Sequence, residues 1–200
     1  TIGIAIDNKR SYGFPHWKNN SLFKNKLPGL APGQGEVYKE PSFDYTPVVI
    51  SPDVHFLYLD GYFQSDKYFK NAENTVRTAF AFKDELVVPV KEVLKDLTNL
   101  CSIHVRRGDY LNYPDIHIQQ SEDYWYKSQL KVESLTDISA YIVFSDDINW
   151  CRANKHLFNK TGKKVLFMQG VTDIDDFIMM SLCDHNIITN STFSWWAAWL

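Results

Sequence analysis

The sequence predicts an α/β protein whose second half contains a Rossmann-like, mostly parallel sheet, and two patterns carry this prediction. Apolar runs rich in β-forming residues alternate with amphipathic segments of helical length, which is typical of βαβ units. Polar residues follow three of these runs directly, and parallel sheets bind ligands beyond the carboxyl ends of their strands. We therefore expect a ligand site where those polar residues meet.

The first part of the chain is predicted to fold as short elements. Residues 15–53 are rich in proline and glycine and are expected to form short strands joined by turns. From residue 66 to residue 82 the apolar side chains recur at helical spacing, which predicts a helix. These elements are assigned to a first domain, residues 1–90.

A domain boundary is expected within residues 84–99. Pro89 interrupts an apolar stretch there, and a proline inside a helix removes a hydrogen bond and clashes with the preceding turn. A helix is expected to continue from Val93 to the first strand of a second domain, residues 91–200.

The second domain is predicted to alternate strands with helices. Its strands are expected at residues 100–103, 141–144, 165–168 and 186–189. Its helices are expected at residues 122–135, 149–158, 174–183 and 195–199. This order favours a parallel sheet covered by helices.

Composition narrows the class of protein. The 200 residues are 44% hydrophobic, which suits a globular protein, and the net charge of −3 gives no support for nucleic acid as a partner. No stretch approaches the roughly 20 apolar residues that a membrane span needs. Cys101, Cys151 and Cys183 form no CxxC pair, so buried free thiols and a reducing compartment are expected.

Two adjacent arginines follow the strand at 100–103, within the sequence His104-Val105-Arg106-Arg107-Gly108-Asp109. A guanidinium is always charged and offers a planar fork of donors that matches phosphate oxygens, so Arg106 and Arg107 suit a diphosphate clamp. One alternative is a surface basic pair held by nearby acids. The other is an adhesion tripeptide at Arg107-Gly108-Asp109, which its place against a strand disfavours.

The two other polar strand ends suit other parts of a nucleotide sugar. Asp146 and Asp147 could accept hydrogen bonds from ribose hydroxyls or base N–H groups, or one of them could only cap the next helix. The third strand end offers hydroxyls and backbone N–H groups to an anion, although Thr192 or Ser194 could also be a helix cap. Its residues are Asn190, Ser191, Thr192, Phe193 and Ser194.

One acidic cluster imitates a metal site. Asp173-Ile174-Asp175-Asp176 resembles the DxD sequence with which some glycosyltransferases hold a divalent cation. It precedes an amphipathic segment, where acids complement the positive end of a helix dipole. We therefore expect helix capping and no metal site.

In their order along the chain, these motifs resemble the α-1,2-fucosyltransferases of glycosyltransferase family eleven. Residues 104–109 match the HxRRxD motif of that family, and Phe144-Ser145-Asp146-Asp147 and 190–196 are similar to its second and third motifs. Shorter similarities at Tyr12-Gly13-Phe14-Pro15 and residues 61–65 extend the resemblance over nearly the whole chain.

The resemblance implies a GT-B-like fold and a galactoside 2-alpha-L-fucosyltransferase, which transfers L-fucose from GDP-fucose to the 2-hydroxyl of a galactoside with inversion. The partners implied are GDP-fucose and a galactoside-terminated glycan. It also implies that residues 1–90 lie on the acceptor side and that residues 91–200 bind the GDP-sugar. Another GDP-sugar transferase and a non-catalytic carbohydrate-binding or nucleotide-binding relative remain alternatives. A kinase is disfavoured, because the chain has no GxxxxGK[ST] loop.

The resemblance also implies roles for individual residues. Arg106, with Arg107 beside it, is expected to contact the donor phosphates without a metal or other cofactor. Asp146 and Asp147 are expected to contact the guanosine, and the third motif is expected to support phosphate or fucose. His104 belongs to the expected donor site, and Asp109 is a candidate base that could instead orient an arginine.

Family members typically begin with a glycine-rich strand and continue beyond the third motif, so we expect this chain to be a fragment that lacks both ends. Trp195, Trp196 and Trp199 would then be exposed. A bacterial or viral source would place the protein in the cytoplasm or peripherally on a membrane, and an animal source would place it in the Golgi membrane.

Overall fold

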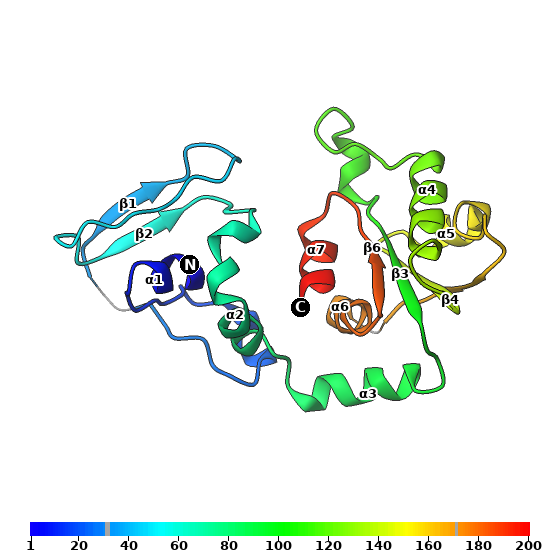
Figure 1. Ribbon diagram of the computed structural model, residues 1–200, viewed down its shortest axis with the longest axis horizontal. Coiled ribbons are helices and arrows are strands. Elements are labelled where there is room, and N and C mark those ends of the chain that lie inside the picture. Colours follow the sequence, from blue (N-terminus) through cyan, green and yellow to red (C-terminus); the bar gives the residue numbers. More distant parts are fainter. Residues whose placement is uncertain (31–32, 171) are drawn as a thin grey trace. The chain divides into compact units, whose positions relative to one another are not determined.

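Two units, Thr1–Asp84 and Glu85–Leu200, make up the computed structural model (Figure 1), which describes residues 1–30, 33–170 and 172–200. Both units contain parallel strands, and the second contains a sheet with helices on its two faces. The predicted α/β class is therefore confirmed.

The first unit pairs two short strands with short helices. Helix α1 spans Ile2–Asp7, strands β1 (Glu36–Lys39) and β2 (Leu57–Asp60) run parallel, and α2 spans Glu73–Ala79. The helix predicted over residues 66–82 is only partly correct, because two 3-10 helices, Asp66–Tyr68 and Lys70–Ala72, precede α2. Within the described part of residues 15–53, β1 is the only named strand. The rest of this stretch contains a 3-10 helix (Lys18–Leu22) and irregular segments.

A small apolar cluster and one asparagine hold this unit together. Ile4, Val48 and Tyr68 are buried against one another. The Asn8 side chain donates to the carbonyl of Val48 at 2.9 Å and accepts from the amide of Ile50 at 2.8 Å. These bonds tie the end of α1 to the segment around Val48 and Ile50.

The second unit is built on a four-stranded sheet in the order β5-β4-β3-β6. Its strands are β3 (Leu100–Val105), β4 (Ala140–Ser145), β5 (Lys164–Phe167) and β6 (His185–Ile187). Every pair is parallel. The four predicted strands are thus found, and their carboxyl ends share one edge of the sheet.

Helices cover both faces of this sheet (Figure 1). The α-helices that follow the first unit along the chain are α3 (Asp84–Leu94), α4 (Glu122–Glu133), α5 (Ile148–Ala153), α6 (Asp173–Ser181) and α7 (Thr192–Trp199). Cys101, Ile103 and Val105 point into the core under α4 and α5. Because side chains alternate along a strand, His104 points to the opposite face, where it contacts Phe193 of α7.

The structure corrects the expectation at Pro89 and confirms the helix capping expected for residues 173–176. Helix α3 runs through Pro89 and includes Val93, but it ends at Leu94 and does not continue to the first strand of the sheet as expected. The φ angle of proline fits a helix, so one proline disrupts the local bonding without ending the helix. Asp175 and Thr172 form a reciprocal capping box at the start of α6, as the capping interpretation requires.

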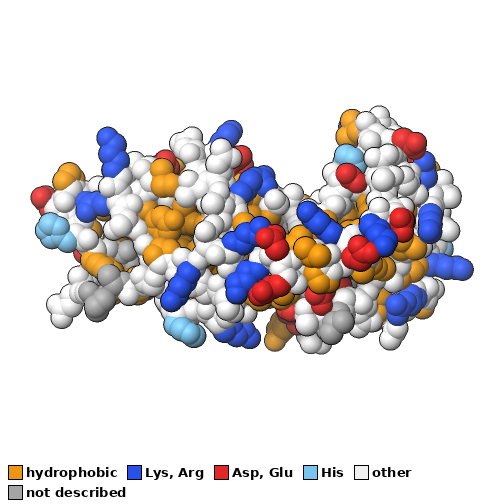
Figure 2. Space-filling model, turned by 90° about the horizontal axis from the view of Figure 1, so that it is seen from below, with side chains coloured by type: hydrophobic (Ala, Val, Ile, Leu, Met, Phe, Trp, Pro, Cys, Tyr) orange, Lys and Arg blue, Asp and Glu red, His pale blue; other side chains and the backbone are white. Residues whose placement is uncertain are grey.

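The three cysteines are free and buried, as predicted, and burial raises the pKa of Cys151 to about 11. Trp195, Trp196 and Trp199 are partly buried and pack against one another, so the expectation that they are exposed is wrong. On the face drawn in Figure 2, basic and acidic side chains are interspersed. Among the described residues, no helix is long and apolar enough to cross a membrane.

We predict that Gly3→Ala destabilises the protein, although alanine usually favours a helix. A Cβ at Gly3 would overlap the carbonyl oxygen of Tyr68 and the backbone of Phe69. Such overpacking costs about 1–3 kcal/mol. Urea denaturation followed by circular dichroism should show this loss. The matched control is Gly29→Ala, where a Cβ meets no atom within 4 Å; equal midpoints for the two variants would contradict the prediction.

Candidate functional site

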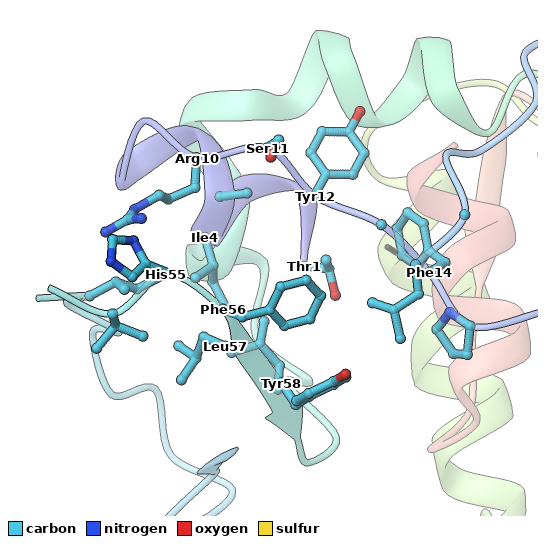
Figure 3. Close-up of a pocket in the computed structure, with 18 residues that line it drawn as sticks. Thr1, Ile4, Arg10, Ser11, Tyr12, Phe14, His55, Phe56, Leu57 and Tyr58 are labelled. Atoms are coloured by element: carbon cyan, nitrogen blue, oxygen red, sulfur yellow. The ribbon is translucent and has the colours of Figure 1, made fainter. Parts of the chain in front are cut away.

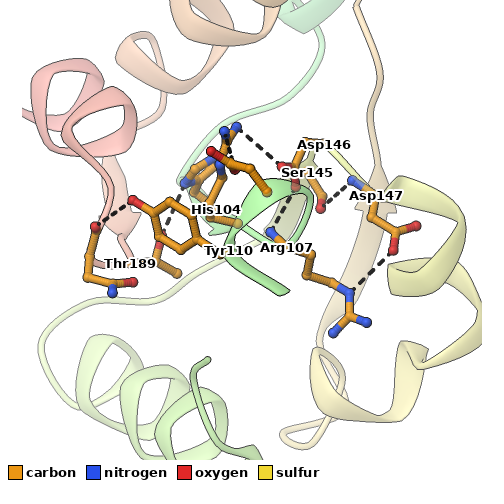
Figure 4. Close-up of polar contacts among 10 residues, drawn as sticks. His104, Arg107, Tyr110, Ser145, Asp146, Asp147 and Thr189 are labelled. Carbon is orange, nitrogen blue, oxygen red and sulfur yellow. Dashed lines mark hydrogen bonds and ion pairs between the residues drawn. The ribbon is translucent and has the colours of Figure 1, made fainter. Parts of the chain in front are cut away.

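Strand register brings the first two polar motifs together. Val105 of β3 pairs with Ser145 of β4, so the residues that follow, Arg106 and Asp146, leave the sheet side by side. The Nη1 atom of Arg106 lies 3.2 Å from Oδ2 of Asp146. The parallel sheet thus converts a separation of forty positions into an ion pair at its carboxyl edge (Figure 4).

Both terminal nitrogens of Arg106 are bound by carboxylates. Nη2 donates to Oδ1 of Asp109 at 2.6 Å, while Nη1 pairs with Asp146. The Asp109 side chain is 60% exposed, against 25% for that of Asp146. Asp109 is therefore the partner of Arg106 that water screens more.

Arg107 is held differently. Its Nε lies 3.3 Å from Oδ2 of Asp147, and its guanidinium carbon lies 3.7 Å from the centre of the Trp150 ring. Asp147 also accepts the amide of Trp150 at 3.1 Å and caps α5. The capping alternative for Asp147 is therefore correct, and the same carboxylate contacts the arginine.

Gly108 lets the loop close over Asp146. A Cβ at Gly108 would overlap a carboxylate oxygen of Asp146. The other oxygen of Asp146 accepts the backbone amide of Arg107 at 2.9 Å. Asp146 thus holds the loop after β3 by both its carboxylate oxygens.

His104 is buried beneath this loop, with its Nδ1 3.3 Å from the hydroxyl of Thr189. Burial lowers the pKa of His104 to about 4, and the nearby carboxylate of Asp146 opposes this only in part. The imidazole is therefore neutral at pH 7, and it contributes shape and hydrogen bonding to the site without a charge.

The third motif borders the same edge. The Tyr110 hydroxyl donates to the carbonyl of Asn190 at 3.1 Å, and the Phe193 ring lies 5.6 Å from that of His104. Ser194 is buried and donates to the carbonyl of Ser191, whereas the side chain of Thr192 is exposed. Thr192 is thus the hydroxyl of this motif that is open to a ligand.

The first unit contains a cavity of about 430 Å³. Figure 3 shows that aromatic rings from two segments surround it. They belong to Tyr12, Phe14, Phe56 and Tyr58. Tyr12 and Phe14 come from a segment with a noted family similarity, but sequence reasoning did not identify a cavity here.

Sequence reasoning also missed Trp150, Tyr110 and Thr189. Trp150 is three residues beyond Asp147, so a capped helix places its amide on that carboxylate. This spacing could have identified the residue. Tyr110 and Thr189 adjoin the motifs without a pattern of their own.

We predict that His104 makes the protein acid-sensitive. Its pKa is about 4 when folded, below the ordinary value of 6.5, so the unfolded chain binds the extra proton between these pH values. The free energy of unfolding should therefore fall as the pH drops from 6.5 to 4, by about 3 kcal/mol in total. Urea denaturation of the wild type and His104→Gln across this range tests it. The prediction would be contradicted if the free energies of unfolding of the two proteins differed by the same amount at every pH.

Curated relatives match this chain at moderate identity. The chain is 35% identical over 146 residues to an alpha-1,2-colitosyltransferase of Escherichia coli, with 70% of this chain and 50% of the relative covered. It is 26% identical over 167 residues to galactoside alpha-(1,2)-fucosyltransferase 1 of Leontocebus fuscicollis, with 72% and 43% covered. The chain thus spans about half the length of the curated relatives it matches.

The fold and the family follow from two further comparisons. A crystal structure of POFUT1 in complex with GDP-fucose matches with a TM-score of 0.55 at 9% identity, covering 72% of this chain and 50% of that one. This likeness shows a GT-B-like fold. The family model described as glycosyl transferase family 11 matches residues 35–200, most of the chain. The chain therefore belongs to glycosyl transferase family 11.

Proposed function

We propose that the protein transfers L-fucose from GDP-fucose to the 2-hydroxyl of a terminal galactoside, with inversion at the anomeric carbon. The observation that carries this proposal is the pair of arginines at the sheet edge of a family 11 chain. A relative named for galactoside fucosyl transfer supports the acceptor and the sugar. Fixed guanidiniums are suited to the charge that develops on the departing diphosphate.

A second donor has an observation in its favour. One of the relatives, at 35% identity, is named for colitosyl transfer. A GDP-linked colitosyl donor is therefore the alternative substrate of the same site. The discriminating contacts would lie at the sugar, while the contacts to the diphosphate would be shared.

We propose that the arginines act without a divalent metal. Supporting this, Asp175 is engaged in the capping box of α6, and Asp176 accepts the amide of Gly170 at 2.6 Å. Two of the three acids of the DxD-like sequence, Asp175 and Asp176, thus have structural roles. The reaction needs positive charge at the leaving group, and Arg106 and Arg107 supply it.

The base that takes the acceptor proton stays a prediction. Asp109 is exposed enough to meet an acceptor hydroxyl, but it contacts Arg106 at 2.6 Å. That contact supports the alternative in which Asp109 orients the arginine. Donor-site roles for the 190–194 motif, peripheral membrane association and the cellular location also stay predictions.

We predict that the protein binds GDP more tightly than UDP and turns over GDP-fucose in the presence of EDTA. Calorimetric titration measures the two affinities, and release of GDP with a β-galactoside acceptor measures turnover. Faster turnover of GDP-colitose than of GDP-fucose would favour the alternative donor. Equal or stronger binding of UDP would contradict the guanosine contacts, and activity restored only by manganese would contradict the metal-free mechanism.

We predict that replacing either arginine by lysine lowers turnover more than donor affinity. Lysine keeps the charge but loses the planar fork that can follow charge on the phosphate oxygens. The expected loss in kcat is about 10²-fold. Lys127→Arg, on the exposed surface of α4, is the control for a change between basic side chains. Near-wild-type turnover in Arg106→Lys and Arg107→Lys alike would refute the clamp.

A further inference from the structure

We propose that Trp150 is a positioning residue that, together with Asp147, presents the terminal nitrogens of Arg107 to the diphosphate of the donor. The inference rests on the proposed function and deepens it. It assigns different tasks to the two arginines and gives a role to a tryptophan outside the three family motifs.

Three contacts from one short turn hold Arg107. Asp146 accepts its backbone amide at 2.9 Å, Asp147 binds its Nε, and the ring of Trp150 lies 3.7 Å beneath its guanidinium carbon. The side chain is only 17% exposed. Backbone, side-chain nitrogen and guanidinium plane are thus each fixed by a different neighbour.

Among the described residues, none bonds to the edge of the Arg107 guanidinium that matches a phosphate. Within residues 1–30, 33–170 and 172–200, its Nη1 and Nη2 atoms have no hydrogen bond or ion pair. The corresponding atoms of Arg106 are both bound, by Asp146 and Asp109. Figure 4 shows the Arg107 side chain reaching Asp147 through Nε, with its terminal nitrogens directed away from the carboxylate. An arriving diphosphate therefore meets a free fork on Arg107 and must displace a carboxylate to reach Arg106.

Stacking and pairing fix the orientation of this fork in advance. A free arginine side chain has many rotamers, and ordering them on binding weakens affinity. The face of the Trp150 ring attracts the cation and excludes water from one side of the guanidinium. Because Trp150 donates its amide to the carboxylate that binds Nε, helix α5 holds the ring and the carboxylate in one frame.

Four variants separate these contributions. Trp150→Leu keeps apolar bulk but removes the aromatic face, whereas Trp150→Phe keeps a smaller face. Asp147→Asn removes the charge while retaining a side chain that favours the N-cap position. Tyr126→Leu, an aromatic-to-leucine change on the exposed part of α4, is the matched control.

The binding test uses GDP and the full chain. We expect Trp150→Leu and Asp147→Asn each to weaken GDP binding about tenfold, the scale of a partly desolvated cation–π contact or paired charge. Trp150→Phe should recover most of the affinity, and Tyr126→Leu should change nothing. In GDP-fucose turnover, KM should rise and kcat should fall in Trp150→Leu and Asp147→Asn. The melting temperature of Asp147→Asn should stay within a few degrees of the wild type.

A second measurement does not depend on activity. The Nε–Hε proton of Arg107, identified by its loss in Arg107→Lys, should be shifted upfield by the Trp150 ring current in the NMR spectrum of the wild type. The shift should shrink in Trp150→Phe and vanish in Trp150→Leu. If the wild type shows no such shift, or if Trp150→Leu binds GDP as the wild type does, the inference is overturned. If the wild type fails to bind GDP while the upfield shift is present, the proposed function fails instead.

Discussion

The neutralisation of two neighbouring guanidiniums at the end of a buried strand is the constraint on which the second unit depends. Adjacent like charges beside an apolar core are unfavourable unless opposite charges lie close by. Asp146 and Asp147 supply those charges from β4, the strand that the parallel register places next to β3. The edge of the sheet, the loop through Gly108 and the first turn of α5 are all organised around these pairs.

These pairs also explain why the site is more than a basic patch. Two arginines face three carboxylates, so the free site has no excess positive charge, and a dianionic ligand must displace a carboxylate to reach Arg106. The competition is unequal, because Asp109 is largely exposed whereas the contacts of Arg107 are sheltered by Trp150. For the proposed donor this arrangement favours a ligand with several phosphate oxygens, which can occupy the free fork of Arg107 and also displace the exposed Asp109 from Arg106.

Much of this could be predicted from the sequence of the second unit. Apolar runs predicted the four strands, three of them through the polar residues that follow, and the family motifs identified His104, Arg106, Arg107 and Asp146 as neighbours at one edge. The ring contact of Trp150 with Arg107 and the hydroxyl contact of Tyr110 could not be predicted, because they depend on side-chain rotamers. The first unit was harder, because its short strands and 3-10 helices have no extended periodicity, and a cavity formed by Tyr12 and Tyr58 depends on tertiary packing.

Asp147 begins a helix and holds an arginine with the same carboxylate. Helix fraying and ligand affinity are therefore linked thermodynamically. Opening the first turn of α5 would break the contact of Asp147 with Arg107, and a ligand bound to Arg107 in this arrangement would make that opening less favourable. The exchange rate of a single amide proton, that of Trp150, would thus report how often the anion site is assembled.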